Sequence, residues 1–264
     1  MTITLRPHQR QACDAMQQHD KGQVIIPTGG GKTMCMIQDA KQQFDQDGST
    51  TIVVVAPRIL LAEQLCKEFL DVITDPMVRV LHVHSGETEH ESTTKPAHIY
   101  DWAVQTWKRN RIIFTTYHSL MRVVESDINV DCIYFDEAHN SVQRNFYLST
   151  LYFSKYADRC YFFTATPKHS LTAQKPGMNN GKVYGQVICN VPAPKLVKEG
   201  YILPPKVVIT ELPTGDQRQS DCKNLIDTID ANSLNKILIA ARSTKQIVRL
   251  ISQSDFTDLL EQRG

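Results

Sequence analysis

Short apolar runs recur along the first part of the chain, and segments with helical periodicity separate them. The runs are rich in Val, Ile, Tyr and Phe and occupy residues 23–26, 51–55, 111–114, 132–135 and 160–163. Nearly continuous apolar runs of this length are typical of strands buried on both faces. Between the first two runs, Ile37, Ala40 and Phe44 fall on one face of a predicted helix. Alternating strands and helices predict an α/β fold, with a parallel sheet flanked by helices.

A polar cluster follows each of these apolar runs. In chain order the clusters read PTGGGKT, APR, TTYH, DEAH and TATP. Each cluster therefore lies at the carboxyl end of a predicted strand, where open α/β sheets bind their ligands. The pattern predicts one functional site at that edge of the sheet.

The pattern changes beyond about Lys175, where a glycine- and asparagine-containing loop precedes a stretch with four prolines, VPAPKLVKEGYILPPK. From Lys206 the sequence KVVITEL predicts a strand, and a further strand is predicted at 236–241, followed by a helix. We therefore predict a first α/β domain over 1–190, a linker over 191–206 and the incomplete start of a second α/β domain over 207–264.

Composition restricts the classes of partner and compartment. Lys and Arg total 29 against 28 Asp and Glu, so any nucleic-acid binding must be local rather than driven by a general basic field. The seven cysteines are scattered without zinc or disulfide spacing, which favours reduced thiols. No signal peptide and no membrane-spanning run is apparent. We expect a cytoplasmic protein with no membrane partner or, if it is viral, a protein located with the DNA.

The segment PTGGGKT combines the features of a phosphate-binding loop. A strand ends, glycines let backbone N–H groups turn inward, and a helix begins at once, which together make an anion cradle. Lys32 would reach the outer phosphates and Thr33 would join Mg²⁺ coordination. The strict pattern G-x-x-x-x-G-K-[ST] fails because Ile26 stands where the first glycine should be. The alternative is a glycine-rich connection with a solvated lysine. The candidate nucleotide-binding residues of the loop are Pro27, Thr28, Gly29, Gly30, Gly31, Lys32 and Thr33.

Two carboxylates, Asp136 and Glu137, emerge side by side from the buried run at 132–135. Unpaired carboxylates would be costly at this position. A magnesium nucleotide would offset that cost, with Asp136 holding the Mg²⁺ water shell and Glu137 orienting and deprotonating the attacking water. The alternative is an acidic helix start that complements the helix dipole.

Other polar side chains have both functional and structural interpretations. Thr164 and Thr166 of TATP could donate hydrogen bonds to His139 or Glu137, or they could cap a turn. No third metal ligand is evident near the alternating histidines of LHVHSG, which favours strand-surface histidines over a metal site. The tryptophans of IYDWAVQTWKRN could stack on nucleic-acid bases, but packing of a helix against the sheet is favoured.

Taken together, the motifs resemble those of superfamily 2 helicases, in the DEAH-bearing branch with the phage UvsW-like helicases and the translocating subunits of type I and III restriction enzymes. LRPHQ resembles the glutamine motif, PTGGGKT motif I, APRILLAEQ motif Ia, TTYHSL a nucleic-acid-contacting motif, DEAH motif II and TATP motif III. They occur in family order and cover most of residues 1–170.

The resemblance implies an ATP-dependent helicase or NTPase with ATP and Mg²⁺ as cofactors. It implies catalytic roles for Lys32, Asp136 and Glu137, with Thr33 and Asp136 as metal ligands. Gln9 would read adenine, and Arg6 belongs to the same nucleotide-binding motif. His139, Thr164 and Thr166 would couple ATP turnover to strand movement.

The resemblance also implies a nucleic-acid partner and favours DNA over RNA, although the residues themselves leave both open. Pro57, Arg58, Thr116 and Tyr117 lie where such proteins grip the nucleic-acid backbone, mainly through phosphates. Taken singly, Arg58 is also explained as a solvated arginine and Tyr117 as a packed tyrosine.

Motors of this family close two RecA-like domains around ATP, and the second domain supplies arginines. Nothing resembling Q-x-x-G-R-x-x-R follows Lys206. We therefore expect an incomplete motor, from a truncated chain, a split gene or a degraded gene. It would bind Mg-ATP weakly and hydrolyse it slowly or not at all unless a second polypeptide supplies the missing half. Two other interpretations are a double-strand DNA translocase that does not unwind, and a non-motor, ATP-responsive binding module that acts through a partner.

Overall fold

The computed structural model describes residues 4–46, 48–172, 174–204, 217–232 and 237–262. The chain separates into two compact units, Met1–Pro204 and Pro205–Gly264. The first unit contains a sheet with helices, and the second contains helices with a small cluster of their own.

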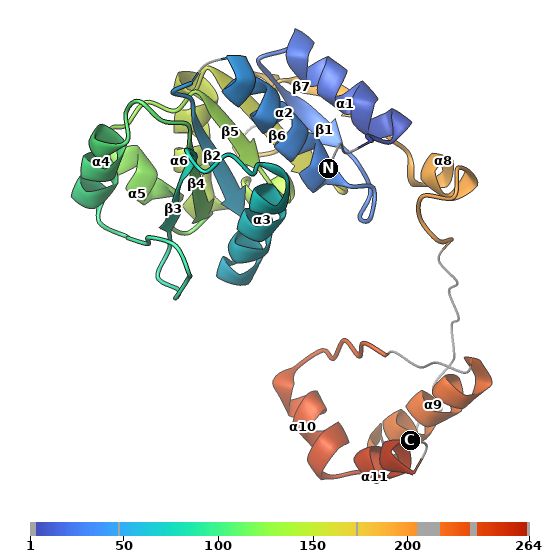
Figure 1. Cartoon of the computed structure of the whole chain (residues 1–264). Coiled ribbons are helices and arrows are strands. Elements are labelled where there is room, and N and C mark those ends of the chain that lie inside the picture. The colour runs from blue at the N-terminus through green and yellow to red at the C-terminus, as the bar shows by residue number, and fades with distance from the viewer. Residues whose placement is uncertain (1–3, 47, 173, 205–216, 233–236, 263–264) are drawn as a thin grey trace. The chain divides into compact units, whose positions relative to one another are not determined.

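The first unit is built on a seven-stranded sheet in the order β3-β4-β2-β5-β6-β1-β7, and every strand pair is parallel (Figure 1). This architecture confirms the predicted α/β fold with a parallel, helix-flanked sheet. The strands are β1 (Lys21–Ile25), β2 (Thr51–Ala56), β3 (Arg79–Val83), β4 (Arg111–Thr116), β5 (Cys132–Phe135), β6 (Arg159–Thr164) and β7 (Gln186–Asn190).

Helices cover both faces of the sheet (Figure 1). Neighbouring positions of β2 enter opposite hydrophobic clusters, with Ile52 and Val54 in one and Val53 and Val55 in the other. The first cluster includes side chains of α1 (Pro7–Gln18), α2 (Lys32–Gln46) and α3 (Ile59–Val72). The second includes side chains of α4 (Pro96–Gln105), α5 (Leu120–Glu125), α6 (Arg144–Tyr156) and α7 (Gly181–Tyr184). Burial on both faces explains the continuous apolar runs.

The five apolar runs correspond to β1, β2, β4, β5 and β6. The edge strand β7 was not predicted; it lies between the predicted loop after Lys175 and the proline-containing stretch from Val191. It pairs only with β1, and most of its side chains are exposed or half-buried. An edge strand therefore lacks the apolar signal of a central strand.

The segment predicted as a linker, 191–206, is folded onto the first unit over its described residues. Helix α8 (Ala193–Lys198) begins after Pro192, and Pro194 lies in its first turn, a position that proline tolerates. Leu196 is fully buried, and Tyr201 and Ile202 pack against the first cluster. Pro192 and Pro194 therefore lie at the start of a helix within the predicted linker.

The second unit contains α9 (Gln217–Asn232), α10 (Thr244–Ser252) and α11 (Phe256–Glu261) in its described residues. Helix α10 agrees with the helix predicted after 236–241. The strand predicted from Lys206 lies outside the described residues. The strand predicted at 236–241 is wrong over 237–241, which are irregular. A strand needs a neighbour for its N–H and C=O groups, and the described residues of this unit include none.

All seven cysteines are buried and free of disulfides. A helix with the length and apolarity needed to cross a membrane was not found in the described part of the chain.

His82 and His84 differ from the prediction of strand-surface histidines, because their side chains are only 0% and 2% exposed. The chain around Ser92 covers the edge of β3 next to His82. His82 Nδ1 lies 2.9 Å from His84 Nε2, and the Gly86 N–H donates to His84 Nδ1. His84 therefore carries its proton on Nε2 and donates it to His82. Within the described residues, no group of three or more metal-binding side chains was found.

This histidine pair predicts acid-sensitive stability. Burial, together with His84 and His90, lowers the pKa of His82 to about 4 from its usual 6.5. Burial also lowers the pKa of His84, and nearby Glu63 opposes that shift. The unfolded chain binds the proton first, so the unfolding free energy is complete above pH 6.5 and falls toward pH 4. For one proton the loss is at most about 1.4 kcal/mol per pH unit.

Urea unfolding of the first unit at several pH values measures this slope. His82→Asn keeps an acceptor for His84 but does not titrate, so its slope should be shallower than that of the unaltered chain. His98→Asn is the control, because the His98 side chain is 45% exposed. Equal slopes for all three proteins would contradict the prediction.

Candidate nucleotide-binding site

The glycine loop, residues 27–31, connects β1 to α2 at the carboxyl edge of the sheet. Strand β1 neighbours β6, and β6 neighbours β5. The segments that follow these three adjacent strands, PTGGGKT, TATP and DEAH, therefore meet at one edge, as the sequence predicted.

Three consecutive carbonyls of the glycine loop face side chains from the start of α1. These contacts join Arg6 Nη1 to Gly29 O (3.5 Å), His8 Nε2 to Gly30 O (2.8 Å) and Gln9 Nε2 to Gly31 O (3.4 Å). In a trans peptide the N–H points opposite to the preceding C=O. The N–H groups of Gly31 and Lys32 therefore point away from α1, at the start of α2, where the helix dipole favours an anion.

Gly29 and Gly31 adopt φ angles of 78° and 83°, which favour glycine. The fit at Gly31 is especially close, because a Cβ there would lie 2.2 Å from Gln9 Nε2. Gln9 is otherwise held by its Oε1 atom, which accepts from the Arg6 N–H at 2.9 Å. The conformation of the loop and the position of Gln9 therefore depend on each other.

We expect Gly31→Ala to weaken nucleotide binding by at least about tenfold, because the left-handed conformation alone costs about 1–2 kcal/mol for a residue with a Cβ. The overlap with Gln9 adds to that cost. Titration with a fluorescent ATP analogue measures the change. Gly181→Ala is the matched control, since a Cβ there meets nothing within 4 Å. Equal affinities for the two variants would contradict the expectation.

An ion pair connects the glycine loop to the DEAH motif. Lys32 Nζ lies 3.2 Å from Glu137 Oε1, and the Lys32 side chain is only 9% exposed. Glu137 has φ 45° and ψ 53°, an uncommon left-handed conformation for a residue other than glycine. Such strain is often found at functional sites. The structure therefore brings together Lys32 and Glu137, two residues that are far apart in the sequence.

The Asp136 carboxyl group is suited to a cation. Burial and the neighbouring Glu137 raise its pKa to about 6, and Lys32 opposes the shift. A half-buried carboxyl beside a second carboxylate lacks full charge compensation, and oxygen ligands of this kind suit Mg²⁺. The residues at this position therefore fit the magnesium ion that the sequence predicted.

His139 and the TATP segment are in direct contact. His139 Nδ1 lies 3.0 Å from Thr164 Oγ1 and 3.4 Å from Glu137 Oε2. Thr164 Oγ1 also accepts from the Thr166 N–H at 3.1 Å. The predicted hydrogen bond between a TATP hydroxyl and the DEAH motif is therefore present, through Thr164 and His139.

The four candidate nucleic-acid residues differ in accessibility. Arg58 is exposed and Pro57 is half-buried, both directly after β2. Thr116 is 4% and Tyr117 is 2% exposed, and the Tyr117 hydroxyl donates to the Asp136 carbonyl at 2.8 Å. The side chains of Thr116 and Tyr117 are therefore packed within the protein.

The two tryptophans also differ. Trp102 is 4% exposed and belongs to the second hydrophobic cluster, as the packing interpretation predicted. Trp107 is 62% exposed, and Lys108 Nζ lies 4.7 Å from the centroid of its ring. Because Trp107 precedes β4, it lies toward the amino edge of the sheet, away from the glycine loop.

Sequence reasoning missed His8 and Tyr201 beside the glycine loop. His8 is within LRPHQ but was given no role, and its buried contact with Gly30 is visible only in the fold. Tyr201 was assigned to the linker, and no local pattern connects it to α1. Its ring contacts both Arg6 and His8.

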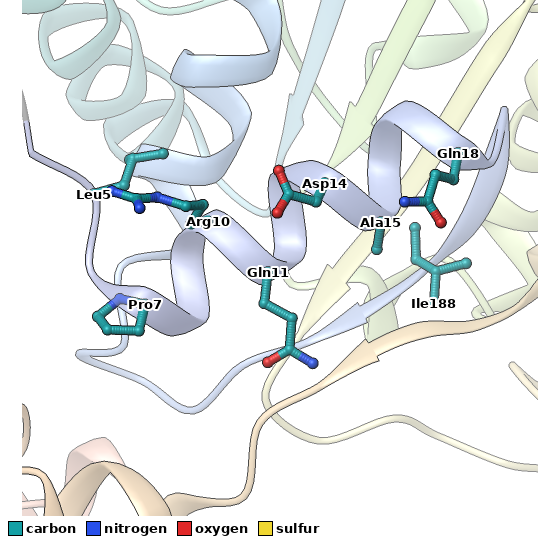
Figure 2. Close-up of a pocket in the computed structure, with 8 residues that line it drawn as sticks. All are labelled: Leu5, Pro7, Arg10, Gln11, Asp14, Ala15, Gln18 and Ile188. Atoms are coloured by element: carbon teal, nitrogen blue, oxygen red, sulfur yellow. The ribbon is translucent and has the colours of Figure 1, made fainter.

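A cavity of about 500 Å³ lies beside the exposed face of α1, but it is not the glycine-loop site. Figure 2 shows Arg10, Asp14 and Gln18 of α1 and Ile188 of β7 around it. Residues 27–33 do not line it, so we assign it no role in nucleotide binding.

The family model described as "Type III restriction enzyme, res subunit" matches residues 2–169. A search of curated proteins gave no match. The LlaGI Type ISP restriction-modification enzyme, as a nuclease-deletion mutant in complex with a DNA substrate mimic, has a TM-score of 0.60 and 20% identity, over 89% of this chain and 23% of that chain.

Two helicase structures show the same likeness of fold. The DUF1998 helicase MrfA has a TM-score of 0.64 and 17% identity, over 98% of this chain and 39% of that chain. The Hef helicase domain of Pyrococcus furiosus has a TM-score of 0.52 and 17% identity, over 98% of this chain and 54% of that chain. The chain therefore spans 23% to 54% of the length of these three proteins.

Proposed function

Because the chain belongs to the type III restriction enzyme res subunit family and has a superfamily 2 helicase-type fold, we propose that it binds Mg-ATP and couples its hydrolysis to movement on DNA. The observation that carries this proposal is the Lys32–Glu137 ion pair at 3.2 Å, which joins the phosphate loop to the DEAH motif. A phosphate-binding lysine and a base candidate are thus together at one strand edge, where parallel α/β sheets bind ligands.

The proposed binding mode uses charges that the site already holds. The triphosphate lies along the N–H groups of the glycine loop, and Lys32 turns from Glu137 toward the outer phosphates. Release of Lys32 leaves the Glu137 carboxylate able to accept a proton from the attacking water. Thr33 and Asp136 would hold Mg²⁺, which neutralises phosphate charge when it is bound.

Base recognition is assigned to Arg6 and Gln9. Gln9 Nε2 donates one hydrogen bond to Gly31 O, and Gln9 Oε1 accepts one from the Arg6 N–H. A side-chain amide has two N–H donors and two acceptor lone pairs, so one of each remains for the edge of an adenine.

The coupling role is proposed for His139, Thr164 and Thr166, because their hydrogen bonds connect the base candidate Glu137 to β6. A shift of Glu137 on phosphate binding or release can therefore move His139 and, through it, Thr164 at the carboxyl end of β6.

DNA is the proposed nucleic acid, supported by the likeness to LlaGI, whose structure contains a DNA substrate mimic. Arg58 is an exposed cation that follows the carboxyl end of β2 and is proposed to contact a phosphate, with Pro57 shaping that turn. Because the side chains of Thr116 and Tyr117 are buried, we propose that this segment contributes only main-chain contacts.

We propose that ATP turnover by this chain alone is slow and that a second polypeptide supplies stabilising arginines. Among the described residues, no arginine forms an ion pair with Asp136 or Glu137. An arginine that stabilises the transferring phosphate contributes about 10³ to 10⁵ in rate in related systems.

Calorimetric titration with Mg-ATP, followed by phosphate release with and without single-stranded DNA, tests the proposal. We expect saturable ATP binding and slow hydrolysis. Absence of ATP binding would overturn the proposed function, and brisk turnover by the chain alone would overturn the requirement for a second polypeptide. Strand-displacement and triplex-displacement assays distinguish unwinding from translocation on duplex DNA.

A further inference from the structure

Tyr201 lies outside every motif of the sequence, yet it contacts the segment assigned to base recognition. The Arg6 guanidinium carbon lies 5.1 Å from the centroid of the Tyr201 ring. The His8 ring lies edge-on to Tyr201, with 5.3 Å between ring centroids and an interplanar angle of 60°. Tyr201 therefore touches two side chains that also bind carbonyls of the glycine loop.

The turn after α8 holds Tyr201 in place. Gly200 has a φ of 75° and reverses the chain, and the N–H groups of Tyr201 and Ile202 both donate to the Leu196 carbonyl. A Cβ at Gly29 would lie 3.4 Å from Ile202, and one at Gly30 would lie 3.1 Å from Leu196. The residues on either side of this turn thus pack directly on the glycine loop, so the position of Tyr201 follows that of the loop.

The contacts with Tyr201 and with Gly29 O limit the rotamers that the Arg6 side chain can adopt. A free arginine side chain samples many rotamers, and ordering it costs about 1.5–2 kcal/mol. Here one contact is to the Tyr201 ring and another is a long hydrogen bond to Gly29 O at 3.5 Å. The Arg6 side chain is half-buried, so part of it stays accessible. A planar guanidinium that rests on an aromatic ring can offer its other face to a second planar group.

We infer that Tyr201 is a positioning residue for purine recognition: it supports the Arg6 guanidinium so that the opposite face stacks on the adenine base of ATP. This inference rests on the proposed function. The inference adds to the proposed function a base-specific role for Tyr201, which is far from the motifs in the sequence. A tyrosine that only packed against the core would affect all ligands of the site alike.

The test compares the full chain with Tyr201→Leu, using two probes, Mg-ATP and inorganic tripolyphosphate with Mg²⁺. Tripolyphosphate occupies the phosphate loop but has no base. We expect Tyr201→Leu to weaken ATP binding about fivefold, which corresponds to one cation–π contact, while tripolyphosphate affinity changes less than about twofold. Tyr201→Phe keeps the ring and should restore ATP affinity relative to the leucine variant.

Arg6→Met provides a second measurement that does not depend on the folding of a Tyr201 variant. We expect it to lose ATP affinity to a similar extent and, when combined with Tyr201→Leu, to show no further loss, because Tyr201 acts through Arg6. Additive losses, equal weakening of both probes, or unchanged ATP binding by Tyr201→Leu would overturn the inference. Absence of ATP binding by the unaltered chain would instead remove the proposed function on which it rests.

Discussion

Glu137→Gln should reduce ATP turnover by about 10²- to 10⁴-fold while leaving ATP affinity within about threefold, because a positioned general base typically contributes this much to the rate. Glutamine has nearly the same shape as glutamate and still offers an oxygen to Lys32, which lies 3.2 Å from the present carboxylate. The substitution therefore removes basicity with little change in packing.

Single-turnover hydrolysis, with the chain in excess over labelled ATP, measures even a slow reaction, and a separate titration measures affinity. Glu125→Gln is the matched control, since Glu125 forms an ion pair with Arg122 on the solvent-facing side of α5 and its side chain is 43% exposed. A Glu137→Gln variant that hydrolyses ATP like the unaltered chain would contradict the assigned role. Full biological function with no turnover would favour the ATP-responsive binding module over a motor.

Arg159→Met should lower the unfolding free energy of the first unit by about 3–5 kcal/mol near neutral pH, the usual cost of removing one partner of a buried ion pair. Arg159 Nη2 lies 3.2 Å from Asp39 Oδ1, and the Asp39 side chain is only 1% exposed. The same carboxylate accepts from Tyr134 at 2.6 Å and from Gln43 at 2.8 Å. Burial already raises the pKa of Asp39, and Arg159 opposes that shift.

Without Arg159, the Asp39 carboxylate is left buried without its cation. Chemical unfolding followed by tryptophan fluorescence reports on the first unit, because both tryptophans lie there. Arg122→Met is the matched control, since the exposed Arg122–Glu125 pair should contribute at most about 1 kcal/mol. Adding Asp39→Asn to Arg159→Met should recover part of the loss. Equal effects of the two arginine substitutions would show that burial does not govern the energy of the Asp39 pair.

The ion pair between Asp39 and Arg159 shows what motifs in a sequence do not predict. Asp39 lies within a helix that periodicity predicts, but its polar side chain faces inward with no local signal for its partner. Arg159 starts a strand that was predicted from its apolar run, yet its contact depends on where that strand lies in the sheet. Only sheet order makes the two side chains neighbours.

The sequence by itself determined the central strands, their parallel arrangement and the edge at which the polar clusters meet. These features follow from local patterns, because a strand buried on both faces needs a continuous apolar run, and parallel strands bring the segments that follow them to one edge. The glycine loop and the DEAH carboxylates were predicted on this basis, and the Lys32–Glu137 pair shows that they are neighbours.

Only the tertiary structure decided which side chains remain accessible and which distant segments touch. It packs Tyr117 inside the protein, pairs His82 with His84, and places Tyr201 against Arg6. The Tyr201–Arg6 contact joins two segments that are far apart in the chain, and the covering of the β3 edge by the chain around Ser92 buries His82. A one-dimensional pattern records the polarity of each residue, but the packing partner depends on the arrangement of the whole sheet.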